Sequence, residues 1–210
     1  NYHLEKLISN KSKDEENTII GLKLIEEEGL MLLFIKTLID FDTFSIITNN
    51  LVEKNVSIRD AKVIELNDGS CIYNFYTDMP KGDAYDIENK IESLIGNLSL
   101  RLEKKQVTRK KKFKLPRRLR SFRTSTKVNF LEDHVHNRTV LEMVSIDRPG
   151  LLVDISEVLR RNNIWIESAK IATIGERAED VFYLRNKHQD AIPLETTKRL
   201  ESELIESLDN

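Results

Sequence analysis

The sequence predicts an α+β fold made of two tandem units, each a four-stranded antiparallel sheet with two helices on one face. Two observations support this prediction: an internal repeat whose two copies align at a constant offset, and the same order of strand-like and helix-like patterns in both copies. A chain of 210 residues has room for two small domains. Its content of 40% hydrophobic and 32% charged residues, with a formal net charge of -2, is typical of a folded globular protein.

The repeat aligns residues 39–63 with residues 146–171. Matching apolar positions, all at an offset of 108, are Phe44 with Leu152, Ile47 with Ile155, Leu51 with Leu159, Val56 with Ile164 and Ile58 with Ile166. Ala61-Lys62 also matches Ala169-Lys170. Ile39-Asp40 matches Ile146-Asp147 at an offset of 107, so we expect the loop between Asp40 and Phe44 to be one residue shorter in the first copy.

Each copy begins with a strand, predicted at residues 31–37 and 139–145, that runs into an amphipathic helix. Apolar residues recur at helical spacing in the second copy, at Leu151, Leu152, Ile155, Val158 and Leu159. Asn55 and Asn162-Asn163 are expected to end these helices. Two β-rich runs then follow in each copy, and we predict hairpin turns at residues 67–69 and at Gly175-Glu176.

A second helix closes each copy. The first is predicted behind the cap Asp83, with an apolar stripe at Ile87, Ile91, Leu94, Leu98 and Leu102. The second begins near Pro193 and carries Leu200, Leu204 and Leu208. Because the chain stops just after this helix, the fourth strand of each sheet is expected from the β-prone runs that precede each copy, residues 18–25 and 124–130.

The resulting division is an upstream connector at residues 1–17, a first module at 18–107, a basic linker at 108–123 and a second module at 124–210. The linker is rich in Lys and Arg, contains Pro116 and has few apolar residues. It is either a phosphate-binding patch or a connector packed on acidic surface. We favour the connector, because only Phe113 and Phe122 supply aromatic rings and no nucleic-acid-binding motif accompanies the patch.

Compartment and targeting follow from composition. The single cysteine, Cys71, cannot form an intramolecular disulfide, and no apolar run reaches the roughly 20 residues that cross a bilayer. No charged and apolar leader opens the chain, so we expect a cytoplasmic protein with no membrane partner. Because the first residue is Asn1 rather than methionine, we expect the chain to be part of a longer protein.

The second copy resembles a specific family at residues 139–152 (TVLEMVSIDRPGLL) and 167–184 (ESAKIATIGERAEDVFYL). Both segments are similar to the second ACT module of PII uridylyltransferase/uridylyl-removing enzymes. The resemblance extends over residues 18–208, is degenerate in the first copy, and includes the basic lead-in at 117–130. It implies two tandem ferredoxin-like ACT modules, glutamine as small-molecule effector, the PII protein as substrate of the parent enzyme, and Mg²⁺ in that parent.

Neither catalytic signature of such enzymes is present in this sequence. It has no paired aspartates after a Gly-Ser strand and no His-Asp doublet, so we expect the catalytic domains upstream and no catalytic residue or cofactor in this piece. His134 and His136, beside Asp133, are more consistent with a polar turn than with a metal site. The parent chain is therefore expected to be the enzyme, and this part its regulator.

The loop before the first helix of copy two is the candidate effector site. Pro149 fixes the backbone and Gly150 permits close approach to the free N–H groups at the helix start, which favour an α-carboxylate. Asp147 would pair with the α-ammonium group. The candidate effector-binding residues are Asp147, Arg148, Pro149, Gly150, Leu151, Ser168 and Lys170. The alternative is that Asp-Arg-Pro-Gly is only a good strand-to-helix turn.

Copy one lacks this loop chemistry. Residues 40–43 contain neither glycine nor proline and carry the additional charge of Asp42, so a carboxylate would fit poorly. Asp40, Asp60 and Lys62 remain candidates for contacts across an interface between modules. We expect Trp165 to pack in the core, Cys71 to be a small buried residue, and Glu176-Arg177 to form a hairpin turn.

Two other functions fit the same sequence. One is a stand-alone ACT-repeat protein that binds a small molecule. The other is a nucleic-acid-binding adaptor acting through residues 108–123, which we do not expect because the rest of the chain is acidic; its binding would depend steeply on salt.

Overall fold

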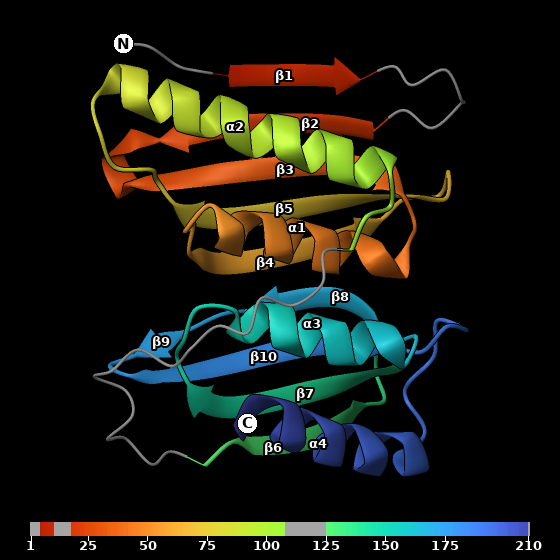
Figure 1. Ribbon diagram of the computed structural model, residues 1–210. Coiled ribbons are helices and arrows are strands. Elements are labelled where there is room, and N and C mark those ends of the chain that lie inside the picture. Colours follow the sequence, from red (N-terminus) through yellow and green to blue (C-terminus); the bar gives the residue numbers. More distant parts are fainter. Residues whose placement is uncertain (1–4, 11–17, 108–124, 210) are drawn as a thin grey trace. The chain divides into compact units, whose positions relative to one another are not determined.

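The computed structural model describes residues 5–10, 18–107 and 125–209. The chain divides into two compact units, Asn1–Thr108 and Arg109–Asn210 (Figure 1). The predicted basic linker and most of the predicted upstream connector lie outside the described residues. None of the described helices is long and apolar enough to cross a membrane.

The first unit is an antiparallel sheet with two helices on one face (Figure 1). Its strands lie in the order β1-β2-β3-β5-β4. The strands are β1 (Glu5–Asn10), β2 (Thr18–Ile25), β3 (Leu30–Leu38), β4 (Ile58–Glu65) and β5 (Ser70–Asp78), and the helices are α1 (Phe41–Glu53), α2 (Ala84–Glu103) and the one-turn η1 (Glu26–Glu28). The prediction of four strands was wrong here, because residues 5–10 of the predicted connector pair with β2 as a fifth strand.

The second unit repeats this arrangement, with strands in the order β8-β10-β7-β6 and the small β9 beside β10. Helices α3 and α4 cover one face of the sheet (Figure 1). The elements are β6 (Lys127–Asp133), β7 (Arg138–Ile146), α3 (Leu151–Arg161), β8 (Trp165–Lys170), β9 (Thr173–Ile174), β10 (Arg177–Arg185) and α4 (Leu194–Asp209). The α+β class is confirmed.

The helix ends coincide with the capping and helix-ending residues identified in the sequence. Asp83 caps α2 by accepting a 2.8 Å hydrogen bond from the Asp86 N–H. Asn55 and Asn163 adopt left-handed backbone angles, φ 56° and 54°, just beyond the C-terminal caps of α1 and α3. The apolar stripes of the four helices then pack on the alternate inward-facing residues of the strands, and this interface is the core of each unit.

The lead-in strands are confirmed. Strand β2 pairs with β3, and β6 pairs with β7 over its full length. Equivalent hydroxyl contacts join each lead-in strand to the strand beside it: Thr18 to Thr37 at 2.9 Å, and Thr126 to Ser145 at 3.1 Å. Thr126 also donates to Asp209 of α4 at 2.6 Å, which ties the start of the lead-in to the last helix of its unit.

The position of the length difference between the copies was predicted wrongly. Strands β3 and β7, and the last residues of α1 and α3, all match at the offset of 108, so no residue is missing between strand and helix in copy one. Strands β5 and β10 match at an offset of 107, so the second hairpin is the shorter one. The first loop is short because α1 begins earlier relative to its strand than α3 does.

Candidate functional site

The loop between β7 and α3, residues 147–150, ends in a glycine whose backbone is left-handed. Gly150 is the N-cap of α3, with φ 83° and ψ 2°. Glycine adopts this conformation at low cost because it has no Cβ. No side chain caps the helix. The start of α3 is therefore formed by backbone alone.

Two of the first backbone donors of α3 are free to bind an acceptor. The Leu151 N–H donates to the Arg148 carbonyl at 3.1 Å, and the Asp154 N–H to the Gly150 carbonyl at 2.9 Å. Among the described residues, the N–H groups of Leu152 and Val153 have no acceptor. Two adjacent donors at the positive end of a helix dipole favour an anion, such as a carboxylate.

Asp147 places a negative charge at the other end of this loop. Its N–H donates to the Glu176 carbonyl at 3.0 Å, and its Oδ2 accepts from the Thr173 hydroxyl at 3.1 Å. The residue is half-buried. The loop thus combines donors for an anion with an acceptor for a cation, which is the pairing that a zwitterion requires.

Arg148 is held within the loop by an ion pair. Its guanidinium donates to Asp154 Oδ2 at 2.6 Å, and the two side chains are only 9% and 11% exposed. The pair neutralises the acid in the first turn of α3 and fixes the loop to the helix. The predicted candidates Asp147, Arg148, Gly150 and Leu151 therefore lie together, while Pro149 is exposed beside them.

Asp180, on β10, was not predicted. It is 1% exposed, its Oδ1 accepts from the Ala172 N–H at 3.3 Å, and its Oδ2 has no hydrogen-bond partner among the described residues. Burial raises the pKa of Asp180 to about 7, the Ala172 N–H opposes that rise, and the charge of Asp147 adds to it. A signal existed in the sequence, because Asp180 takes an inward-facing phase of β10, in line with Ala178, Phe182 and Leu184.

Ser168 and Lys170 face away from Asp180 and from the loop before α3. Ser168 pairs with Tyr183 and Lys170 with Val181, whereas the buried Phe182 pairs with the buried Ala169 between them. Since side chains alternate along a strand, Ser168 and Lys170 project from the face of the sheet opposite to the helices. The structure does not bring them to the start of α3.

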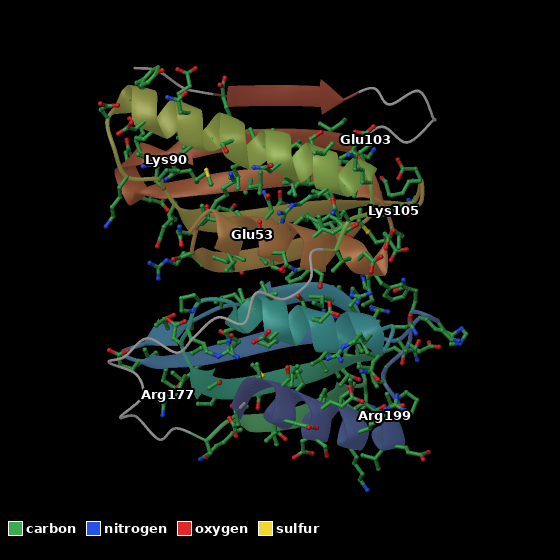
Figure 2. The ribbon with its side chains drawn as sticks, viewed as in Figure 1. Glu53, Lys90, Glu103, Lys105, Arg177 and Arg199 are labelled. Atoms are coloured by element: carbon green, nitrogen blue, oxygen red, sulfur yellow. The ribbon has the colours of Figure 1, made fainter. Side chains whose placement is uncertain are left out.

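The equivalent helix start in the first unit is capped by a side chain. Asp40 is extended (φ -151°) and its Oδ1 accepts from the Asp42 N–H at 2.8 Å. Its Oδ2 forms an ion pair at 3.3 Å with Lys105, just beyond the end of α2 (Figure 2). A carboxylate of the protein itself thus occupies the position that α3 leaves open.

The residue equivalent to Asp180 in the first unit is Tyr73. Asp180 pairs with Met143 on β7, and Tyr73 pairs with Ile35 on β3, which is the counterpart of Met143 in the repeat. Tyr73 is 1% exposed. Burial raises the pKa of its hydroxyl well above the usual value. The charge of the neighbouring Asp40 adds to this rise, and the Thr43 side chain opposes it. A large side chain therefore fills the space below the start of α1.

The remaining candidates of the first unit lie on β4. Asp60 pairs with Tyr76 and accepts from the Ala61 N–H at 2.9 Å, and Lys62 pairs with Asn74 and is exposed. Both project from the face of the sheet opposite to the helices, as do Ser168 and Lys170 in the second unit. Their role across an interface stays a prediction.

Three residues expected to have structural roles are buried or lie in a turn. Trp165 and Cys71 are buried, and burial raises the pKa of the Cys71 thiol to about 12. His136 lies in the turn between β6 and β7, 2.9 Å from Asp133 Oδ2. Within residues 5–10, 18–107 and 125–209, no group of three or more His, Cys, Asp or Glu could hold a metal ion.

The chain is similar in sequence to proteins named bifunctional uridylyltransferase/uridylyl-removing enzyme. It is 32% identical over 204 residues to the one from Photobacterium profundum, which covers 97% of this chain and 23% of that protein. For the one from Vibrio cholerae the identity is 31% over 196 residues, covering 93% of this chain and 22% of the relative. The chain thus spans less than a quarter of the length of the curated relatives it matches.

Other comparisons give less. No family model matches the sequence. Among solved structures, aspartate kinase from Synechocystis aligns with 92% of this chain and 28% of its own, with a TM-score of 0.48 and 15% identity. What the comparisons give is similarity, over nearly the whole chain, to a part of the bifunctional uridylyltransferase/uridylyl-removing enzymes.

Proposed function

We propose that this chain is the C-terminal regulatory region of a bifunctional enzyme that uridylylates and deuridylylates the PII protein, and that it senses glutamine through its second unit. The observation that carries the proposal is the open start of α3, where the Leu152 and Val153 amides have no acceptor among the described residues and Asp147 lies in the same loop. Similarity to the named relatives supports the choice of parent enzyme.

The proposal includes the fold family. In each unit a helix links two strands that lie on either side of a third strand, and a second helix follows that third strand. This is the strand arrangement of a ferredoxin-like ACT module, with the outer strand supplied by the lead-in segment instead of by the C-terminal end. We therefore infer two tandem ACT modules, the first with an added strand.

The glutamine site follows from the chemistry of the loop. Glutamine would place its α-carboxylate on the two amides of α3 and its α-ammonium group against Asp147. Each charge-assisted hydrogen bond of this kind is stronger than a neutral one. An amino acid satisfies both ends at once, whereas a simple anion or cation satisfies one.

The parent's chemistry belongs to residues outside this chain. Mg²⁺ is expected in the catalytic domains, and no metal-binding group of three or more ligands is found in the described part of this sequence. Glutamine bound here can shift the balance between uridylylation and its reversal only if it contacts two conformations differently. The catalytic domains and the PII protein are the partners of this proposal, in the cytoplasm.

Isothermal titration calorimetry of the 210-residue chain with L-glutamine tests the proposal. We expect saturable heat with L-glutamine and much weaker binding of glutaric acid, which lacks the ammonium group and carries a carboxylate in place of the side-chain amide. D-Glutamine, with the same charges in mirror-image geometry, is the matched control and should bind more weakly. Absence of glutamine binding, or equal binding of all three compounds, would remove the sensing function from this chain.

A further inference from the structure

We propose that Asp180 is a second ligand-binding carboxylate, which together with Asp147 binds the ammonium group of the effector from below the loop. This inference rests on the proposed function, because it assigns a residue to the same site. It adds a buried carboxylate on β10 to a site that the sequence located only in the loop between β7 and α3.

The Asp180 carboxyl group is buried and incompletely hydrogen-bonded. One oxygen accepts a long hydrogen bond of 3.3 Å from the Ala172 N–H, and the other has no partner among the described residues, although the residue is 1% exposed. A buried carboxylate without a partner is costly unless a cation or a donor satisfies it. Asp147 does not satisfy it, because a second carboxylate repels the first.

Asp180 lies close to Asp147. It is on the core-facing side of β10, and the two carboxylates accept hydrogen bonds from the consecutive residues Ala172 and Thr173. Two neighbouring carboxylates favour a cation between them. A primary ammonium group carries three donors and can bind oxygens of both. A zwitterionic amino acid would then place its carboxylate on the α3 amides.

The segment opposite Asp180 is loosely paired. Pairing between β8 and β10 ends at Lys170, and β9 resumes at Thr173, so among the described residues few hydrogen bonds hold this segment. These are the Ala172 N–H to Asp180 bond, the Glu179 N–H to Ala172 carbonyl bond at 2.8 Å, and the Thr173 hydroxyl to Asp147 bond at 3.1 Å. Two of the three end on the proposed ligand carboxylates, so an ammonium group would replace them.

The first unit differs from the second at each of these points. There β4 pairs with β5 without a break opposite Tyr73, and the Tyr73 ring takes the place of the small carboxylate. Asp40 caps the helix. The open helix start, the buried carboxylate and the interrupted strand pairing of the second unit are thus all absent from the first. This difference is expected if Asp180 binds a ligand in the second unit alone.

Calorimetry with two compounds and two variants tests the inference. The compounds are L-glutamine and 4-carbamoylbutanoic acid, which is glutamine without its ammonium group. We expect Asp180→Asn to weaken glutamine binding about 10- to 150-fold, which corresponds to the loss of one charge-assisted contact. The affinity for the deaminated compound should stay the same or rise. Tyr73→Phe, at the equivalent position of the first unit, should change neither affinity.

The outcomes separate the two proposals. If the unmodified chain binds no glutamine, the sensing function fails and this inference fails with it. If the unmodified chain binds glutamine and Asp180→Asn binds both compounds within twofold of it, only the role of Asp180 is overturned.

A measurement on the unmodified chain covers the case in which Asp180→Asn does not fold. Because burial raises its pKa to about 7, Asp180 holds a proton on the acid side of neutrality, and an ammonium group must displace that proton. The charge of the neighbouring Asp147 raises this pKa further, and Arg148 forms an ion pair with Asp154. Titration in buffers of different ionisation enthalpy should show proton release on glutamine binding that is larger at pH 6 than at pH 8. Binding with no proton release at pH 6 would overturn the assignment.

Discussion

The starts of α1 and α3 solve the same structural problem in opposite ways. Both helices follow a strand of nine residues in the same position of the sheet, and both must satisfy N–H groups that have no partner within the helix. Asp40 supplies a carboxylate to α1, whereas Gly150 supplies nothing to α3. The comparison teaches that, within a duplicated fold, one capping side chain decides whether a helix start is self-sufficient or open to a ligand.

The residues below the two helix starts differ in the same sense. Tyr73 fills the space below α1 with an aromatic ring. Asp180 places a shorter side chain below α3, and its second oxygen has no partner in the described part of the chain. At these two positions the first unit has a capping carboxylate and a packed aromatic ring. The second unit has a glycine and a buried carboxyl group that lowers its stability when ionised, as functional sites commonly do.

The largest expected effect concerns this buried charge and pH. The pKa of Asp180 is raised from 3.8 to about 7 in the folded protein, so the folded state binds the proton more tightly than the unfolded state. Stability should therefore fall as pH rises from about 4 to about 7, by up to roughly 4 kcal/mol, and change little from this residue above that range. Urea unfolding of the second unit between pH 4 and 8 measures it.

Asp180→Asn should remove this slope and raise stability at pH 8. Above about pH 5 the carboxyls of Asp68 and Asp133 do not contribute to this slope, because hydrogen bonds lower the folded-state pKa of each from 3.8 to about 2 and both groups are then ionised in the folded and the unfolded state. Identical pH profiles for the unmodified chain and the variant would show that Asp180 is not a charged, uncompensated group.

The next effect is on ligand binding. Asp147→Asn should weaken glutamine binding by about 1.5 to 3 kcal/mol, because it removes a charge-assisted contact. Asp42→Asn, in the first turn of α1, is the matched change and should matter far less, since Asp40 already occupies the Asp42 N–H. Calorimetry of both variants decides. Equal losses would mean that the two helix starts are not functionally different.

A smaller effect tests the cap of α1. Asp40→Ala should lower the stability of the first unit by about 1 kcal/mol, because the Asp42 N–H loses its acceptor. The ion pair with Lys105 is exposed on the lysine side and should add little. Urea unfolding gives the change, and glutamine affinity should stay constant. A loss of glutamine binding in this variant would link the first unit to the site.

The smallest effect is expected in the basic linker. Replacing Arg117, Arg118 and Arg120 by alanine should leave glutamine affinity intact and alter stability by roughly 0 to 1 kcal/mol per ion pair lost. Calorimetry of the triple variant checks the affinity. A large loss of glutamine binding would make the basic segment part of the site.

Much of the fold was predictable because hydrophobic period and capping residues act locally. The apolar stripe behind Asp83 identified α2, and the unused β-prone runs identified β2 and β6 as the outer strands. Strand β1 escaped prediction because a six-residue segment has too short a pattern to separate from a connector.

The site was predictable only in part, for physical reasons. Asp147 and Gly150 belong to a continuous turn whose backbone requirements are visible in the sequence. Asp180 joins them through strand pairing, which brings β10 beside β7. The loop comparison failed because an earlier helix start resembles a deletion in an alignment: Asp40 was matched to Asp147, whereas in the structure Asp40 is the cap and so corresponds in role to Gly150.

The stoichiometry of glutamine binding tests the central claim most directly. If only the second unit senses the amino acid, calorimetry of the 210-residue chain should give one site per chain, and the affinity of that site should fall about 10- to 150-fold in Asp147→Asn. Two equivalent sites per chain would contradict the account, since the capped start of α1 has no place for a second carboxylate. A single site that survives Asp147→Asn unchanged would contradict it equally, because the ligand would then be bound elsewhere.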